Sequence, residues 1–199
     1  MSTHSVRFFE RQFQNQVAEA RYELNPFETL ALPHLAGEVL DLGCGLGNLA
    51  LAGAAHGARV TALDASPTGI ARLREAATGA GLPVRAHCTD LVHYAIDADY
   101  DVIVCIGLLM FFPEAAARSL LADITQHVRP GGVAVVNVLT EGTTFLGMFE
   151  PGHYTLFPRG EIARAFAGWT IIADSHDTFP APGETLKAFD TLIARRPGA

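Results

Sequence analysis

The chain has 199 residues, of which 49% are hydrophobic and only 18% are charged. That length and composition suit one compact domain that buries a sizeable core. The formal net charge of −7 argues against nucleic acid as a partner, because phosphates would be repelled and no basic patch offsets the repulsion.

Cysteine usage and apolar runs bear on the cellular compartment. Cys44, Cys88 and Cys105 fall in or beside apolar runs, and their odd number favours a reducing cytoplasm over a disulfide framework. Met1 to Phe13 lacks the apolar core of a signal peptide, and no apolar run reaches the roughly 18 residues that cross a bilayer. We therefore expect a cytoplasmic protein, a monomer or a homodimer, with no membrane partner.

Residues 1–36 are predicted to form an N-terminal helical extension. Aromatic and charged residues recur at roughly helical spacing over residues 7–22. Asn25-Pro26 supplies an N-cap and a first-turn proline for a short helix to His34. Two interpretations of the aromatic side chains stay open, a lid over a bound ligand or an apolar face packed on the domain. These side chains are Phe8, Phe9 and Phe13.

Residues 37–140 alternate strand with helix and are expected to form the cofactor-binding half. Apolar strands are predicted at residues 39–42, 59–64, 84–88, 100–106 and 132–139, and helices at 49–56, 66–81 and 113–128. Such alternation implies parallel βαβ units with both sheet faces covered by helices. Ligands in these sheets bind beyond the carboxyl ends of the strands.

Residues 141–199 are predicted to form a substrate-side loop and the closing strands. Thr140 to Phe157 lacks periodicity and indicates a loop, and a short helix follows at 158–167. Closing strands are expected at Trp169–His176 and Leu186–Ala194; the loop Asp177–Thr185 joins them directly, which makes them antiparallel. We therefore expect residues 1–199 to be a single Rossmann-like, doubly wound α/β domain. Its sheet should have about seven strands, mostly parallel with an antiparallel last strand, and helices on both faces.

The stretch Asp41-Leu42-Gly43-Cys44-Gly45-Leu46-Gly47 joins the first strand to the next helix. Glycines accept positive φ and let a ligand approach the bare backbone. Dinucleotide sites favour G-x-G-x-x-G, whereas here the third glycine comes one position early. The acid at the start of this turn would repel a pyrophosphate and suit an ammonium group. The pattern therefore favours a cationic, amino-acid-like ligand.

A second acid stands at the tip of the second strand. Asp64 lies 21 positions after Gly43, where an acid commonly accepts hydrogen bonds from both hydroxyls of a ribose. The plainer interpretation is a helix-capping or solvated acid.

The glycine motif resembles the first motif of class I S-adenosylmethionine-dependent methyltransferases. The resemblance implies S-adenosyl-L-methionine as cofactor and a methyl transfer as the reaction. It implies that Asp90 accepts from the adenine amino group, although that residue alone could be a turn acid. The segment from Cys105 to Phe112 begins at the end of the fourth strand, where the family places the reacting methyl group. The implied cofactor-binding residues are Asp41, Gly43, Cys44, Gly45, Asp64, Ala65, Asp90, Leu91 and Cys105.

Within that superfamily the chain is similar to the tellurite-resistance and thiopurine-type small-molecule methyltransferases, from about Val39 to Arg195. Further motifs that carry the likeness are Arg129-Pro130-Gly131-Gly132 and Phe157-Pro158-Arg159-Gly160-Glu161. Tellurite-type members carry a His-Arg pair and a further Arg near the last strand, thought to handle an anionic acceptor. This chain has Phe179-Pro180-Ala181-Pro182 and Lys187-Ala188 in roughly those places, which favours a neutral small-molecule acceptor.

The sequence shows no catalytic triad and no metal-binding cluster. Methyl transfer from a sulfonium is an in-line displacement that mainly needs alignment and exclusion of water, so their absence does not count against it. His153, Tyr154 and His176 are candidates for acceptor contacts, with a solvated side chain as the alternative for each. Two other functions stay open: a non-catalytic S-adenosylmethionine-binding protein and a nucleotide-dependent oxidoreductase.

Overall fold

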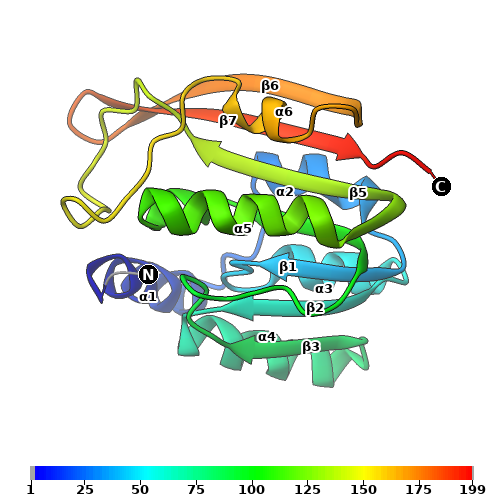
Figure 1. Ribbon diagram of the computed structural model, residues 1–199. Coiled ribbons are helices and arrows are strands. Elements are labelled where there is room, and N and C mark those ends of the chain that lie inside the picture. Colours follow the sequence, from blue (N-terminus) through cyan, green and yellow to red (C-terminus); the bar gives the residue numbers. More distant parts are fainter. Residues whose placement is uncertain (1–2, 199) are drawn as a thin grey trace.

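The computed structural model describes residues 3–198, so the outermost residues of the predicted domain, 1–2 and 199, lie outside the described residues. Seven strands form one sheet within the described residues, in the order β3-β2-β1-β4-β5-β7-β6 (Figure 1). The strands are β1 Glu38–Leu42, β2 Arg59–Asp64, β3 Val84–Cys88, β4 Tyr100–Ile106, β5 Val128–Leu139, β6 Thr170–Ala181 and β7 Thr185–Arg195. The α-helices are α1 Thr3–Ala18, α2 Pro26–Ala31, α3 Asn48–Ala55, α4 Pro67–Ala80, α5 Glu114–His127 and α6 Glu161–Ala165.

The strand directions confirm the predicted sheet. Strands β1 to β5 pair in parallel, and β7 is antiparallel to both of its neighbours, β5 and β6. The chain passes from β1 outward to β3 and then crosses back to β4, so the strand order reverses between β1 and β4. The carboxyl ends of the parallel strands therefore meet at one edge, with the reversal point in the middle.

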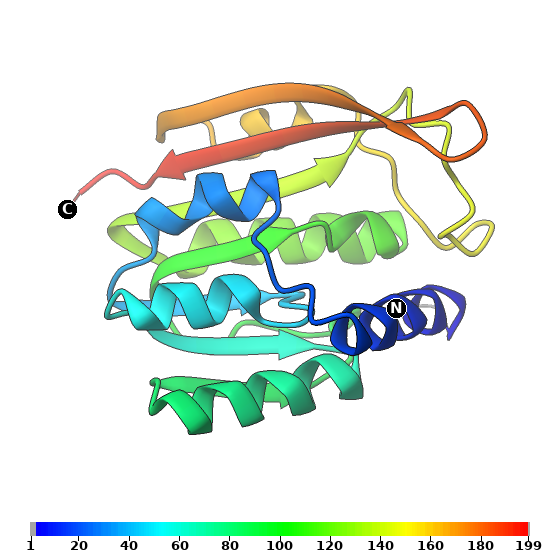
Figure 2. The same ribbon diagram turned by 180° about the vertical axis from the view of Figure 1, so that it is seen from behind.

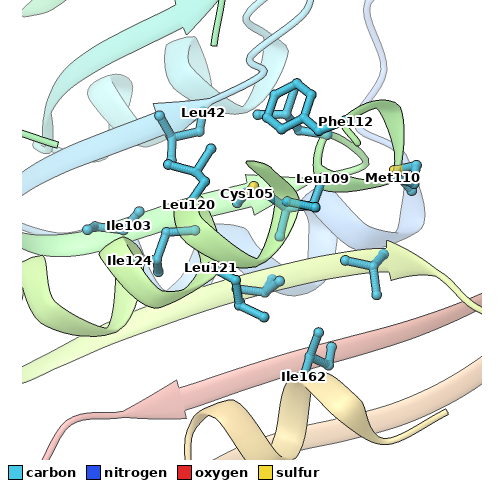
Figure 3. Packing of buried hydrophobic residues seen from close by; sticks show 14 of the residues in the cluster. Leu42, Ile103, Cys105, Leu109, Met110, Phe112, Leu120, Leu121, Ile124 and Ile162 are labelled. Carbon is cyan, nitrogen blue, oxygen red and sulfur yellow. The ribbon is translucent and has the colours of Figure 1, made fainter. Parts of the chain in front are cut away.

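Helices cover both faces of the sheet. α5 and α6 lie on one face, and α2, α3 and α4 lie on the other (Figures 1 and 2). Because side chains alternate along a strand, each strand contributes to two cores. Leu42 and Ile103 pack with Leu120 and Ile124 of α5 in the first core, part of which Figure 3 shows. The second core joins the alternate strand residues to α2, α3 and α4.

The closing hairpin is tighter than its sequence indicated. The loop predicted over Asp177–Thr185 is wrong, because β6 continues to Ala181, which pairs with Thr185 of β7. Proline has no N–H to donate, but Pro180 stands in β6, an edge strand, where that loss is tolerated. β5 likewise begins at Val128 rather than at residue 132, directly after α5.

The N-terminal segment lies across the carboxyl edge of the sheet. α1 crosses beside the ends of β1 and β2, and α2 packs on the face that α3 also covers (Figure 2). Asn25 caps α2 in a capping box, in which its side chain accepts from the Glu28 N–H and the Glu28 carboxylate accepts from the Asn25 N–H. No helix within the described residues is long and apolar enough to cross a membrane.

We expect opposite effects from alanine at the two glycines of α4. A Cβ at Gly69 would stand 2.3 Å from the carbonyl oxygen of Gly45, so Gly69→Ala should destabilise the protein by about 1–3 kcal/mol. Gly79 faces open space, and Gly79→Ala should stabilise it by about 0.5–1 kcal/mol. Urea unfolding of both variants measures the difference; equal shifts would show that α4 does not press on the turn at Gly45.

Candidate functional site

A cavity of about 330 Å³ opens at the carboxyl edge of the sheet. Its walls come from α1, the turn after β1, the ends of β2, β4 and β5, the beginning of β7, and α2. The site therefore lies where the strand order reverses, as the topology predicts for a ligand.

The turn after β1 presents bare backbone to this cavity. The N–H groups of Gly43 and Cys44 both donate to the carbonyl oxygen of Leu63, at 2.8 and 3.1 Å, which ties the turn to β2. Gly45 has a φ of +55°, and a Cβ there would stand 3.1 Å from the ring of Phe13. A side chain at this position would therefore fill the space between the turn and α1.

Asp64, the last residue of β2, holds the turn from the other side. One carboxylate oxygen accepts from the Gly45 N–H at 2.8 Å, and the other accepts from the Ser66 N–H at 2.7 Å. Burial raises the pKa of Asp64, and these N–H donors counteract part of the rise. Each carboxylate oxygen has two lone pairs, so both can accept a further hydrogen bond from a ligand.

Asp41, on β1, is the least satisfied polar group of the cavity. Its side chain is 4% exposed, and its Oδ2 has no hydrogen-bond partner among the described residues. Burial raises the pKa of Asp41 to about 8, and the nearby carboxylates of Glu28 and Asp64 add to the rise. A buried carboxyl without a partner is costly, and a bound cation would remove that cost.

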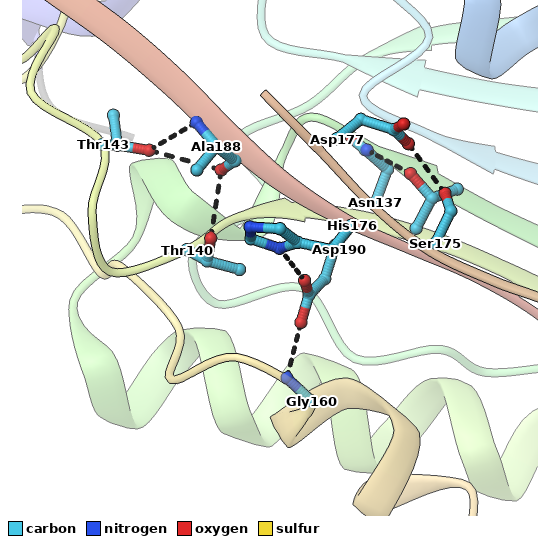
Figure 4. Close-up of polar contacts among 10 residues, drawn as sticks. Asn137, Thr140, Thr143, Gly160, Ser175, His176, Asp177, Ala188 and Asp190 are labelled. Carbon is cyan, nitrogen blue, oxygen red and sulfur yellow. Dashed lines mark hydrogen bonds and ion pairs between the residues drawn. The ribbon is translucent and has the colours of Figure 1, made fainter. Parts of the chain in front are cut away.

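Two further polar groups face the cavity from the β5 and α2 side. Asn137 of β5 is fully buried; its Nδ2 donates to the Thr191 Oγ1 at 2.9 Å, and its Oδ1 has no partner among the described residues (Figure 4). Glu28 of α2 lines the cavity, and burial raises its pKa. Neither residue was among the sequence-predicted site residues. A polar residue within the apolar strand Val133–Leu139 was the signal that could have identified Asn137.

Six of the nine predicted cofactor-binding residues line the cavity, and three do not. Those that line it are Asp41, Gly43, Cys44, Gly45, Asp64 and Ala65. Asp90 is exposed and accepts from the Val92 N–H, and Leu91 is buried in the core beneath α5. Cys105 is also fully buried there, because alternation along β4 turns it away from the face of Val104 (Figure 3).

The three candidates for acceptor contacts lie away from this cavity. His153 is exposed in the loop after β5, and Tyr154 stacks on Phe149 with ring centroids 4.6 Å apart. His176 Nδ1 lies 2.7 Å from Asp190, whose other oxygen accepts from the Gly160 N–H at the start of α6 (Figure 4). His176 of β6 therefore contacts Asp190 of β7, and Asp190 in turn contacts the start of α6. The described residues contain no cluster of His, Cys, Asp and Glu that could hold a metal ion.

The chain resembles known proteins in sequence. Residues 39–132 match the family described as methyltransferase domain. Hemagglutinin 1 of Eikenella corrodens is 31% identical over 168 residues, which cover 81% of this chain and 55% of that protein. A ubiquinone biosynthesis O-methyltransferase of Pseudomonas aeruginosa is 29% identical over 124 residues, which cover 59% of this chain and 53% of that protein. The chain thus spans about half the length of the curated relatives it matches.

Solved structures share the fold. TehB from Haemophilus influenzae has a TM-score of 0.74 at 22% identity, over 87% of this chain and 62% of that chain. The N-methyltransferase NodS from Bradyrhizobium japonicum, in complex with S-adenosylhomocysteine, has a TM-score of 0.73 at 20% identity, over 98% of this chain and 99% of that chain. The sheet order and these structures show the Rossmann-like fold that TehB and NodS share, and residues 39–132 are similar to the methyltransferase domain family.

We expect the stability of the protein to fall as pH rises, because of Asp41. Its pKa in the folded state, about 8, exceeds the ordinary value of 3.8, so the folded state binds the extra proton between these two values. The free energy of unfolding therefore decreases as pH rises through that window, and Asp41→Asn should make the decrease smaller, because only Asp64 and Glu28, whose pKa values are also raised, then contribute to it. Urea unfolding at about pH 5, 7 and 9 tests this. Exposed Asp99→Asn serves as control, and parallel profiles for wild type and Asp41→Asn would contradict the expectation.

Proposed function

We propose that the protein is an enzyme that transfers a methyl group from S-adenosyl-L-methionine to a small-molecule acceptor. The single observation that carries the proposal is the buried Asp41 carboxyl, without a partner among the described residues at its Oδ2 and placed beside a glycine-rich turn. A group with this environment fits a ligand that brings its own positive charge. The cofactor of this family carries such a charge.

The residues present fit that cofactor. Asp41 would face its cationic amino-acid end, the backbone of Gly43 to Gly45 would lie against it, and the Asp64 carboxylate would accept from the ribose hydroxyls. The adenine contacts of Ala65, Asp90 and Leu91 stay predictions that follow from the family resemblance. When bound, the cofactor supplies an electrophilic methyl group whose leaving group is a neutral sulfide.

We further propose that α1 is a lid that excludes water from the site. Phe9 and Phe13 line the cavity from α1, and Phe9 also packs edge-on against Phe111, with ring centroids 4.9 Å apart. Glu10 links this helix to the start of α4, where its carboxylate accepts from the hydroxyls of Ser66, at 2.5 Å, and Thr68. Burial raises the pKa of Glu10, but these hydrogen bonds outweigh it and hold the pKa below its ordinary value.

The kind of methyl acceptor, the cellular location and the oligomeric state are also proposals. A net charge of −7 and a cavity of about 330 Å³ support a small-molecule acceptor rather than nucleic acid. All three cysteines are free thiols, which supports a reducing, cytoplasmic location. We also propose that the protein is a monomer or a homodimer.

Calorimetry with S-adenosylmethionine and S-adenosylhomocysteine tests the cofactor. We expect both to bind, and Asp64→Ala to weaken binding by about 1.5–3 kcal/mol, the range for hydrogen bonds to a charged group. Exposed Asp99→Ala is the matched control, and thermal unfolding verifies that both variants fold. Binding of NADH in place of the sulfonium cofactor would instead favour an oxidoreductase. Cofactor binding without turnover over a broad acceptor panel would favour a non-catalytic binding protein.

The lid proposal has its own test. Glu10→Ala removes the link between α1 and α4, so it should weaken cofactor binding by about two- to tenfold, as expected for one or two lost hydrogen bonds. Amide hydrogen exchange should be faster in α1 than in the wild type. Arg11→Ala, an exposed change on the same helix, should alter neither quantity. Unchanged affinity and unchanged exchange for Glu10→Ala would show that α1 does not act as a lid.

A further inference from the structure

The charged groups around the cavity are predominantly acidic. Four acidic side chains line it, those of Glu23, Glu28, Asp41 and Asp64. Lys187 is the only basic side chain among the described residues of the lining, and its Nζ lies 4.8 Å from the centre of the Phe145 ring. Such a lining attracts cations and repels anions before any specific contact forms.

Two polar residues of the cavity, Asn137 and Glu28, have no role in the proposed cofactor contacts, although Glu28 lies near Asp41. The proposed function assigns Asp41 and Asp64 to the cofactor. Asn137 belongs to β5 and pairs with Thr191 of β7, two strands away from β1. Glu28 belongs to α2, where the neighbouring Phe27 packs on Phe189 of β7 with ring centroids 4.9 Å apart. α2 and the β5–β7 pair therefore form one wall of the cavity.

This wall offers hydrogen-bond acceptors to a ligand. Asn137 is fully buried, its Nδ2 is used by Thr191, and its Oδ1 has no partner among the described residues. One carboxylate oxygen of Glu28 accepts from the Asn25 N–H at 2.8 Å, which leaves the other available to a ligand. A buried acceptor without a donor costs free energy, and a ligand that carries several N–H groups would remove that cost.

From this wall we infer the class of acceptor. We propose that the acceptor is a small primary or secondary amine, which enters as its ammonium ion, binds Asn137 Oδ1 and Glu28, and is methylated on nitrogen. The inference rests on the proposed function and names the substrate of that same site.

The wall also provides a group, Glu28, that can accept the proton an ammonium ion must lose before it can react. Burial penalises both charges of an ammonium–carboxylate pair, and it raises the pKa of Glu28. The ammonium proton can therefore pass to the Glu28 carboxylate, which leaves a neutral amine with a free lone pair. The amine nitrogen then forms a bond to the methyl carbon as the carbon–sulfur bond breaks and its electron pair stays on sulfur. The methylated product leaves as an ammonium ion, and Glu28 returns its proton to water, so one proton is released per turnover.

Oxygen acceptors fit this wall less well. A hydroxyl or phenol must become an anion to react, and the surrounding carboxylates oppose a further negative charge. The same carboxylates would repel an oxyanion or carboxylate substrate. The Lys187 ammonium group, which could attract such a substrate, lies over the Phe145 ring. An amine begins with a positive charge and only has to become neutral.

Binding in the presence of S-adenosylhomocysteine tests the proposal without turnover. The probes are phenethylamine, 2-phenylethanol, 2-phenylethanethiol and 3-phenylpropanoate, which share a phenyl group, together with propylamine, propanol, propanethiol and propanoate as a smaller set. We expect calorimetry to show binding of an amine and no binding of the matched carboxylate. Glu28→Gln should weaken amine binding by about tenfold or more, and should change the affinity for S-adenosylhomocysteine much less, through the loss of the Glu28 charge near Asp41. Glutamine can still accept from the Asn25 N–H, so the capping box of α2 is kept.

The controls separate this proposal from the function on which it rests. Glu75→Gln removes an exposed carboxylate of α4 and should change neither affinity. Asn137→Leu, which removes the buried acceptor, should weaken amine binding, and its thermal unfolding shows whether it folds. Failure of the wild type to bind S-adenosylhomocysteine would overturn the proposed function. If the cofactor product still binds, three results would overturn the amine proposal alone. These results are no binding of any amine, tighter binding of an alcohol, thiol or carboxylate than of its matched amine, and full amine affinity in Glu28→Gln.

Discussion

The burial of Asp41 is the constraint around which the site is organised. Its carboxyl lies at the carboxyl end of a central parallel strand, where helices cover both faces of the sheet and little water reaches it. An apolar residue there would cost nothing, whereas an acid raises the free energy of the folded protein unless a positive charge is near. The described structure provides no such charge beside Asp41, and it places the acids of Glu28 and Asp64 close by instead. The folded protein therefore has an electrostatic cost at Asp41, and a bound cationic ligand would lower that cost.

The elements around that carboxyl are shaped to bring a ligand close to the backbone. Gly45 lets the Phe13 ring of α1 approach the turn closely, while Asp64 fixes the turn by accepting from the Gly45 N–H. Close packing of Gly69 against the Gly45 carbonyl holds the start of α4 next to the same turn. Three local features that look unrelated in the sequence, a glycine run, a strand-end acid and a glycine in the next helix, therefore define one surface.

The two halves of the cavity differ in origin, and this division suggests how one fold can serve different acceptors. The half near β1 and β2 is built from consecutive βαβ units, whose geometry the parallel sheet dictates. The half near Asn137 and Glu28 combines β5, β7 and α2, which are far apart in the chain. Residues there are held by tertiary packing, such as the contact of Phe27 with Phe189.

Much of the fold was determined by the sequence alone, because periodicity and turn residues act over short distances. Strands β2, β3 and β4 were predicted with the bounds that the structure has, and β1 with one residue fewer; the strand-end positions of Asp41 and Asp64 followed from β1 and β2. The tertiary structure alone decided the rest. It extended β6 past Pro180, because pairing with β7 outweighs the local preference for a loop. It also brought Glu28 and Asn137 to the cavity, because contacts between residues that are distant in the chain leave no periodic signal in the sequence.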